Sequence, residues 1–323
     1  MVSSMIAVDG LSPDAPLVSV IVPVFNGRDS LEPAIDSALA QTVPLEVVVV
    51  DDGSTDGSGD IAASIAERDP RVRLIQQTNR GLAAARNVGL RQSRGIYVAF
   101  LDADDLWLPR KLATQLPFLA EDRVVFSDAF VMRCVSEGEE RIFRPGMLDS
   151  PIDFERLLEH NLVPILTAVV GRQLLLDVGG FDEELRSVED WDLWLRLRLT
   201  RDVAFVAIAE PLACYHVNPE GLSSDRVSMA RWRLRVLQKL AASSEPTRRT
   251  VTRRAKAEKQ LLAGELRARA WRLVEDGSLV DARTDLREAI RLAPRPAAAV
   301  TTLLLTTSDA LLRWAAARSR EAG

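Results

Sequence analysis

A chain of 323 residues with 47% hydrophobic and 27% charged residues can bury one large or two ordinary cores, which excludes a disordered or fibrous protein. Its two cysteines, Cys134 and Cys214, are too few for a disulfide framework or a zinc cluster and fit a reducing compartment. The formal net charge of −5 is unevenly spread: residues 1–225 carry 20 Lys and Arg against 36 Asp and Glu, and residues 226–323 carry 21 against 10. Net charges of −16 and +11 predict two domains with these boundaries and different partners.

The sequence offers no clear membrane-inserted segment. Met1 to Gly10 lacks a basic start and a sustained apolar core, which argues against a signal peptide. The longest apolar run, Leu162 to Gly171, contains Pro164 and is too short to span a bilayer. We therefore expect a cytoplasmic protein, with peripheral contact at the inner face of the cell membrane.

Strand and helix patterns alternate through the first hundred residues. Apolar runs typical of buried strands occupy Val18 to Val24, Leu45 to Val50, Val72 to Ile75 and Ile96 to Leu101. Amphipathic helical patterns lie between them, at Ser30 to Leu39, Asp60 to Arg68 and Gly81 to Arg91. This alternation predicts an α/β domain with a mostly parallel sheet and helices on both faces.

Three carboxylates end the fourth predicted strand. Asp102, Asp104 and Asp105 follow the apolar run directly, at the edge where open α/β sheets place their ligands. Two side chains with one residue between them, such as Asp102 and Asp104, can converge on a hard divalent cation, which could bridge to phosphate oxygens. The alternative is an acidic turn that caps the next helix.

A nicotinamide-binding domain fits the sequence poorly. Pro23 to Gly27, after the first strand, offers one glycine, and Gly57 to Ala62 follows its strand only beyond an acidic turn. A nucleotidyltransferase would need a Gly-rich, basic loop after the first strand, and Phe25 to Asp29 does not provide one.

Six motifs in order resemble the large family-two inverting glycosyltransferases of the A-type fold. They are Val18 to Asn26, Val50 to Asp56, Asn79 to Asn87, Phe100 to Asp105, Gly179 to Asp182 and Glu189 to Asp192. The resemblance covers about residues 17 to 224. It implies a nucleoside-diphosphate sugar as donor and Mn²⁺ or Mg²⁺ as cofactor.

The resemblance also implies the residues that hold the nucleotide. Pro23, Phe25 and Asn26 would line its site, and Asp52 would accept a hydrogen bond from a uracil or thymine base. The alternative for Asp52 is an Asx-turn stabilised by Gly53.

The donor's ribose and diphosphate have their own expected partners. By the same resemblance, Asp102 would face the ribose and Asp104 would hold the metal, with Asp105 supporting them or capping a helix. Arg80 and Arg86 would meet the diphosphate near a helix start. The alternative for both arginines is a solvated helix face.

The acceptor side is expected from residue 124 onwards. Val124 to Val131 is predicted as a further strand, and Leu162 to Gly171 resembles the acceptor-side strand of the family, with Thr167 facing an acceptor. Ser187 is a candidate N-cap for a helix that starts near Asp190. Asp190 is expected to be the general base of single-displacement transfer.

Alternatives remain open around that helix. Glu189 and Asp190 suit the first turn through the helix dipole alone, and Asp192 or Glu189 is the next candidate base. Trp191 and Trp194 could form a sugar platform, although helical spacing favours core packing.

One motif departs from the family pattern. Relatives often carry a Tyr-Arg-x-His motif before a serine-containing turn, and here Tyr215 to Asn218 places His216 at the arginine position and Asn218 at the histidine position. We expect Asn218 to contact the metal or diphosphate and His216 to lie closer to the acceptor.

The basic C-terminal region is predicted to be all helical. Met229 to Leu240 is amphipathic, Arg248 to Lys259 is a basic run, and Thr301 to Arg318 is a last helix. Leu266 to Pro294 resembles one tetratricopeptide-type hairpin, which must pack on neighbouring helices.

These patterns predict an inverting glycosyltransferase that moves a sugar, on a uridine or thymidine diphosphate, to a glycan or lipid-linked acceptor in surface polysaccharide assembly. The helical region is expected to contact an anionic membrane or build an oligomer, and no nucleic-acid partner is expected. The alternatives are a non-catalytic sugar-nucleotide-binding scaffold and a nucleotidyltransferase. Loss of an acidic cluster would favour the scaffold, and all three clusters are present.

Overall fold

The computed structural model describes residues 16–132, 140–201, 203–218, 221, 224–242, 245 and 247–294. The chain divides into two compact units, a sheet unit (Met1–Asn218) and a helical unit (Pro219–Gly323). The segment from Met1 to Gly10, Cys134 and the helix expected from Thr301 to Arg318 lie outside the described residues.

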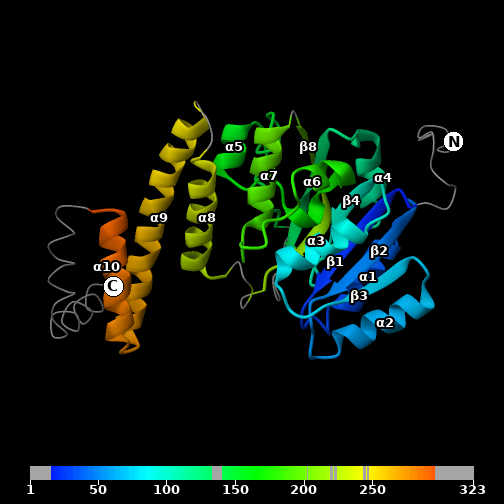
Figure 1. The fold of residues 1–323 in the computed structure, drawn as a ribbon, viewed down its shortest axis with the longest axis horizontal. Coiled ribbons are helices and arrows are strands. Elements are labelled where there is room, and N and C mark those ends of the chain that lie inside the picture. The colour runs from blue at the N-terminus through cyan, green and yellow to red at the C-terminus, as the bar shows by residue number, and fades with distance from the viewer. Residues whose placement is uncertain are drawn as a thin grey trace. The chain divides into compact units, whose positions relative to one another are not determined.

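An eight-stranded mixed sheet organises the sheet unit (Figure 1). The strands are β1 Val18–Val24, β2 Leu45–Asp51, β3 Val72–Gln76, β4 Tyr97–Phe100, β5 Leu106–Trp107, β6 Arg123–Met132, β7 Val169–Gly171 and β8 Ala204–His216. Their order is β3-β2-β1-β4-β7-β6-β8-β5. The first four strands pair in parallel, as predicted, whereas β7 runs antiparallel to both β4 and β6.

Helices cover both faces of the parallel half. They are α1 Leu31–Leu39, α2 Ser58–Arg68 and α3 Leu82–Gln92. In β2, Val47 and Val49 share a core with α1 and α2, while Val48 and Val50 pack with Ala85 of α3. This alternation explains why the strand is apolar at successive positions. A Cβ on Gly89 of α3 would lie 2.4 Å from Ile21, so glycine allows α3 to approach the sheet closely.

The second half of the sheet unit contains several short helices and the 12-residue helix α7. They are α4 Lys111–Gln115, η1 Leu116–Phe118, α5 Phe154–Glu159, η2 Ile165–Thr167, α6 Arg172–Asp177 and α7 Glu189–Thr200. The predicted strand from Val124 to Val131 is confirmed as β6.

The prediction of a strand from Leu162 to Gly171 is mostly wrong. Only its last three residues form β7, and Ile165–Thr167 forms the 3-10 turn η2. The backbone N–H and the hydroxyl of Thr167 both donate to the carbonyl of Pro164, at 2.9 and 2.8 Å. The chain therefore turns after the proline, which cannot donate to a sheet.

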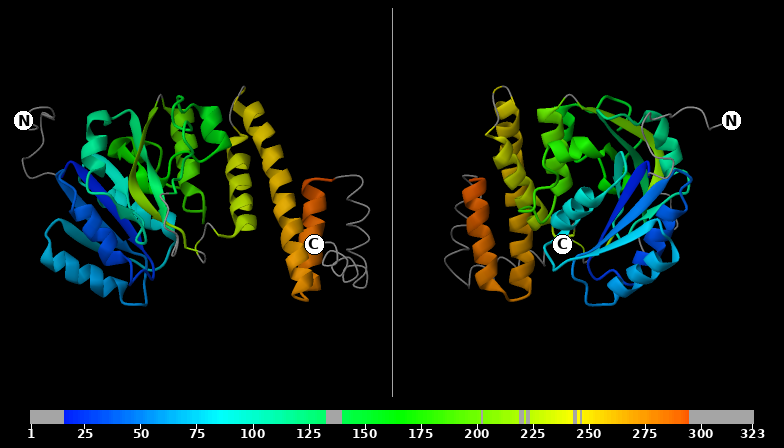
Figure 2. Two further views of the ribbon diagram at one scale, coloured as in Figure 1. Left: turned by 180° about the vertical axis from the view of Figure 1, so that it is seen from behind. Right: turned by 45° about the vertical axis from the view of Figure 1, so that its right-hand side comes forward.

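The helical unit contains α8 Arg226–Leu240, α9 Thr247–Glu275 and α10 Leu279–Leu292. The expected helical tail is confirmed, and α9 and α10 lie side by side as a hairpin that turns at Gly277, where φ is +83° (Figures 1 and 2). The basic run Arg248 to Lys259 continues directly into this hairpin as one 29-residue helix. No helix within the described ranges is both long and apolar enough to cross a bilayer.

Candidate functional site

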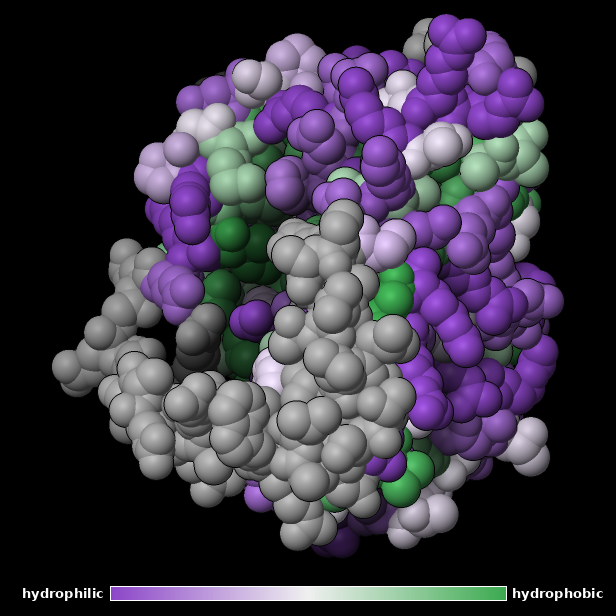
Figure 3. Space-filling view, turned by 90° about the vertical axis from the view of Figure 1, so that its left-hand side faces the viewer, coloured by the Kyte–Doolittle hydropathy of each residue, from purple (hydrophilic) through white to green (hydrophobic). Residues whose placement is uncertain are grey.

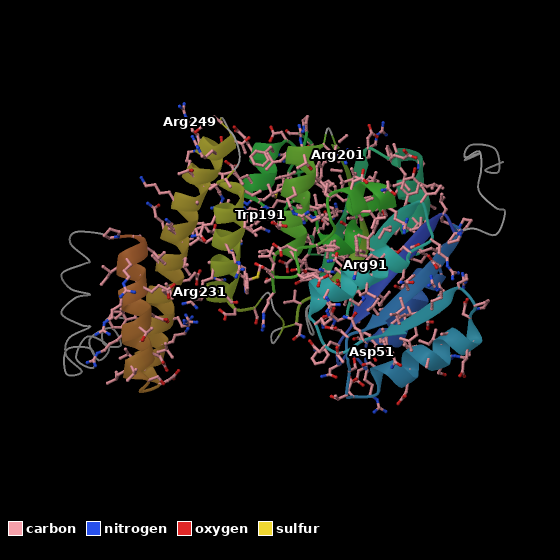
Figure 4. The ribbon with its side chains drawn as sticks, in the orientation of Figure 1. Asp51, Arg91, Trp191, Arg201, Arg231 and Arg249 are labelled. Atoms are coloured by element: carbon pink, nitrogen blue, oxygen red, sulfur yellow. The ribbon has the colours of Figure 1, made fainter. Side chains whose placement is uncertain are left out.

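The carboxyl ends of three parallel strands bring the predicted nucleotide-site residues to one edge of the sheet. β1 ends before Phe25 and Asn26, β2 ends at Asp51 and leads to Asp52, and β4 leads to Asp102. Figure 4 labels Asp51 at this edge. The parallel pairing therefore brings residues separated by up to 77 positions in the chain to the same edge of the sheet.

Asn26 ties the loops after β1 and β2 together. Its side-chain oxygen accepts the N–H of Thr55 at 2.8 Å, and its own N–H donates to the hydroxyl of Ser54 at 3.0 Å. Asn26 has φ of +53°, a left-handed conformation that asparagine tolerates better than most residues. Next to it, Phe25 is 52% exposed, so an apolar ring stands open at this edge.

Asp56 continues the same link. Its carboxylate accepts the N–H of Arg28 at 2.9 Å and both the N–H and the hydroxyl of Ser58. Burial alone would raise the pKa of Asp56, but these hydrogen bonds outweigh it and lower the pKa. The loop is therefore held by a carboxylate that stays charged.

Asp52 organises the segment before α3. Its buried carboxylate accepts hydrogen bonds from the side chain of Gln77 at 2.6 Å and from the N–H groups of Arg80 and Gly81 at 2.9 and 2.8 Å. The Asx-turn alternative is wrong for Asp52, because these partners lie 25 to 29 residues along the chain. The neighbouring Asp51 accepts the N–H of Ser54 instead.

The three carboxylates after β4 differ in environment. Asp104 is exposed, Asp102 is half-buried, and Asp105 is buried. Asp105 accepts the backbone N–H of His216 at 2.8 Å, so it fixes the end of β8 beside the acidic turn. Burial and the charge of Asp102 raise the pKa of Asp105.

Arg86 is the central side chain of the site. It is 2% exposed, and its two terminal nitrogens contact different carboxylates, Asp102 at 2.6 Å and Glu189. Burial alone would lower the pKa of Arg86, but the charges of Asp102 and Glu189 raise it above its usual range. The solvated-face alternative for Arg86 is wrong, and its charge links the turn after β4 to the start of α7.

The start of α7 is strained. Val188 precedes the helix with φ of +56°, which is rare for a β-branched residue, and it makes no side-chain cap. The N-cap prediction for Ser187 is therefore wrong, because Val188 holds that position. The ion pair of Glu189 with Arg86 fixes the backbone immediately after the strained residue.

Asp190 follows Glu189 and is held by a residue that the sequence did not indicate. The side-chain amide of Asn161 donates to Oδ2 of Asp190 at 2.8 Å, and the N–H of Trp191 donates to Oδ1 at 2.7 Å. Burial raises the pKa of Asp190, while the Asn161 hydrogen bond and the Arg86 charge oppose the rise. Asn161 lies 29 residues away on a loop, so no local spacing could predict this contact.

Two tryptophans of α7 belong to the core. Trp191 and Trp194 are 1% and 0% exposed, and their indole N–H groups donate to the carbonyls of Leu157 and Val163. Figure 4 labels Trp191 on α7. The sugar-platform alternative is wrong for both, and the acceptor-facing position expected for Thr167 is also wrong, because Thr167 is fully buried.

Asp192 has a structural role. Arg196 donates to it at 2.7 Å and also donates to the carbonyls of Val178 and Gly180. The side chain of Asn87 holds the next residue, Phe181, through both its N–H and its carbonyl. Asp192 is fully buried and its carboxylate already pairs with Arg196, which disfavours it as a general base.

Arg80 remains accessible. Its guanidinium is about half exposed and forms an ion pair with Glu183 at 2.8 Å. His216 is half-buried at the end of β8, and Asn218 is exposed two residues later.

The residues at and near the acidic turn could supply only some of the ligands of a divalent cation. Carboxylate and amide oxygens, as in Asp104 and Asn218, are hard donors suited to Mg²⁺ or Mn²⁺. Among the described residues, no group of three His, Cys, Asp or Glu side chains could hold a metal by itself. The remaining ligands would come from water and from the diphosphate of a bound donor.

Comparison with known proteins agrees with this geometry. The family model "Glycosyl transferase family 2" matches residues 19–181. This chain belongs to glycosyl transferase family 2.

Relatives extend the match toward the C-terminus. The chain is 33% identical over 221 residues to the "Putative teichuronic acid biosynthesis glycosyltransferase TuaG" of Bacillus subtilis, covering 67% of this chain and 85% of that protein. It is 38% identical over 160 residues to an uncharacterized glycosyltransferase of Haemophilus influenzae, covering 49% of this chain and 63% of the relative. The protein is therefore a glycosyltransferase.

Solved structures share the fold. Staphylococcus aureus TarS 1-349 in complex with UDP-GlcNAc superposes with a TM-score of 0.60 at 20% identity, covering 95% of this chain and 92% of that one. The mannosyltransferase PcManGT of Pyrobaculum calidifontis, in complex with GDP-Man and Mn²⁺, gives 0.59 at 23% identity, covering 94% and 86%. The A-type fold expected from the motifs is confirmed.

The two arginines before and within α3 should differ in their contribution to stability. Arg86→Ala leaves two carboxylates without their shared cation, so the free energy of unfolding should fall by about 3 to 5 kcal/mol. Arg80→Ala removes an exposed pair and should cost less than about 1 kcal/mol.

Urea denaturation followed by circular dichroism measures both values. Arg86→Lys keeps the charge but loses the two-pronged guanidinium, so its free energy of unfolding should lie between those of wild type and Arg86→Ala. Equal, small losses for the Arg80→Ala and Arg86→Ala variants would contradict a central role for Arg86.

Proposed function

We propose that this enzyme transfers a sugar from a uridine or thymidine diphosphate donor to a hydroxyl of a glycan or lipid-linked glycan, with inversion. The observation that carries the proposal is the position of Asp190. Its carboxylate is half-buried and is oriented by Asn161. The preceding residue, Glu189, pairs with Arg86, which also pairs with Asp102.

The proposed reaction is a single displacement. The acceptor hydroxyl attacks the anomeric carbon, its proton passes to Asp190, and the bond from that carbon to the diphosphate oxygen breaks. The nucleoside diphosphate leaves with the electron pair. The raised pKa of Asp190 suits this role because a stronger base accepts the proton more readily.

The donor would bind at the carboxyl edge of the sheet. Pro23, Phe25 and Asn26 would line the nucleotide site, Asp52 would contact the base, and Asp102 would contact the ribose. Asp52 already holds the N–H groups of Arg80 and Gly81, so base recognition would be coupled to the position of this loop.

The two arginines take different parts in this proposal. The half-exposed guanidinium of Arg80 would meet the diphosphate. Arg86 is enclosed by Asp102 and Glu189, so we assign it to positioning these residues rather than to direct contact with phosphate.

A divalent cation would be held by Asp104 and Asn218 together with the donor. Mn²⁺ or Mg²⁺ there would neutralise charge that develops on the leaving diphosphate. The PcManGT complex, which shares the fold, contains Mn²⁺, and this supports the use of a divalent cation.

The proposed acceptor class is supported by one relative and by charge. The TuaG relative is named for teichuronic acid biosynthesis, which supports a role in surface polysaccharide assembly. Residues 226–323 carry a net charge of +11, which would hold the enzyme at an anionic membrane where lipid-linked acceptors lie.

Membrane attachment is expected to depend on salt. The full chain should co-sediment with anionic liposomes at low salt and be released at high salt, since screening weakens surface electrostatics. Neutral liposomes are the control, and equal recovery under all conditions would remove this part of the proposal.

Asp190→Asn tests the base. The substitution keeps the size of the side chain and removes its basicity, so sugar transfer should fall by roughly 10² to 10⁴-fold while donor affinity barely changes. Transfer near the wild-type rate would assign the base elsewhere.

Asn161→Ala provides a separate test through pH. Loss of the hydrogen bond that favours the carboxylate should raise the pKa of Asp190 further. Because the base must be deprotonated, the acidic limb of the kcat profile should move to higher pH. An unshifted limb with reduced kcat would instead indicate a purely structural role for Asn161.

Metal affinity tests the cation assignment without relying on activity. Manganese binding, measured calorimetrically with saturating nucleoside diphosphate, should be largely lost in Asp104→Ala, modestly weakened in Asn218→Ala and little changed in His216→Ala. A loss in His216→Ala as large as that in Asp104→Ala would make the histidine the ligand.

A further inference from the structure

Helix α9 carries an apolar face that the described residues of the helical unit leave exposed. The buried residues of its second half, Leu262, Leu266 and Ala270 among them, pack with α8 and α10. At 100° per residue, the opposite side of the helix carries a run of exposed apolar or small residues, Ala257, Leu261, Gly264, Ala268 and Trp271, with the exposed polar residue Gln260 beside it. We call the five apolar or small residues the α9 stripe.

The α9 stripe is unusual for a solvated helix surface. Leu261 is 56% exposed and Trp271 is 36% exposed, and both are among the large exposed apolar side chains of the described residues. Hydrophilic residues cover most of the coloured surface seen from the side at the left of Figure 1 (Figure 3). On α9 itself, Arg253 and Glu275 lie beyond the two ends of the stripe, and the exposed residues Gln260 and Arg272 border it.

The spacing of the stripe favours another helix as its occupant. Successive members are separated by 4, 3, 4 and 3 residues, which is the seam pattern of a coiled coil. A Cβ on Gly264 would meet nothing within 4 Å, so the surface is open at the point where two helices would approach most closely.

Four of the five members of the stripe lie symmetrically about Leu266, and the mirror position of the fifth, Ala257, is Glu275. Gly264 and Ala268 lie two residues on either side of Leu266, and Leu261 and Trp271 lie five residues on either side. In an antiparallel pair of α9 helices centred there, the small residues face each other at the crossing. Leu261 of each copy then packs on Trp271 of the other, over about 15 Å of helix between these two positions.

Charge selects the antiparallel direction. The first half of α9 is strongly basic, with Arg248, Arg249 and Arg253, and the described helix ends in Glu275. Arg249 extends from the start of α9 (Figure 4) and is 85% exposed. A parallel pair would set these arginines against each other, whereas the antiparallel pair places Glu275 of one copy within one turn of Arg253 of the other.

We propose that two copies of this chain associate through the α9 stripe as a two-fold antiparallel helix pair. A two-fold contact uses the same patch on both copies, which the four symmetric members of the stripe satisfy. Since each copy contributes mainly one helix, the interface is small, and dissociation is expected in the micromolar range.

Sedimentation velocity on the full chain, from about 1 to 200 µM, tests the proposal across that range. A reversible monomer–dimer equilibrium is expected. Ala268→Arg places a bulky charge at the crossing and should raise the dissociation constant by more than about tenfold. Thr252→Arg is the matched control, because it adds the same charge to an exposed position of α9 away from the stripe.

A charge exchange tests the direction of the pair. Arg253→Glu and Glu275→Arg should each weaken the dimer, and the double variant should restore it. A chain that stays monomeric, as it would if residues 295–323 or the sheet unit covered the stripe, would overturn the proposal. So would a trimer or an assembly indifferent to Ala268→Arg.

Discussion

The ion pairs of Arg86 with Asp102 and Glu189 are the interaction on which the site depends. Three segments meet there: α3 supplies the arginine, the turn after β4 supplies Asp102, and α7 supplies Glu189. A guanidinium that is 2% exposed is costly to bury unless charges of opposite sign surround it. The two carboxylates stabilise Arg86, and Arg86 in turn fixes their positions.

This arrangement explains how the strained start of α7 is held. Val188 adopts a left-handed conformation that costs free energy, and the pairing of Glu189 opposes relaxation of the backbone. Asp190 is thereby presented next to the donor motif, where Asn161 orients its carboxylate. The proposed donor side, at Asp102, and Glu189 beside the proposed base are therefore parts of one charged network.

The sequence predicted the parallel half of the fold because its strands are apolar on both faces, as in β2, and because helical patterns separate them. It also placed Asp52 and Asp102 at the carboxyl edge of the sheet, because each follows a predicted parallel strand. It could not predict which side chains pair across the fold. Arg86 with Glu189 spans 103 residues, and Asn161 with Asp190 spans 29, so neither contact leaves a local pattern. Ser187 was misjudged as the N-cap because capping is decided by backbone conformation, which spacing alone does not give. The core packing that helical spacing favoured for Trp191 is what the structure has.

Coupling between the two sides of the site can be measured directly by calorimetry of uridine diphosphate binding to wild type, Asp102→Asn, Glu189→Gln and the double variant. Glu189 lies on α7 and is not expected to touch the nucleotide. If Arg86 couples the two carboxylates, Glu189→Gln should nevertheless weaken binding, and the effects of the two substitutions should be non-additive by about 0.5 to 3 kcal/mol. Unchanged affinity in Glu189→Gln, or strictly additive losses, would contradict a shared network through Arg86.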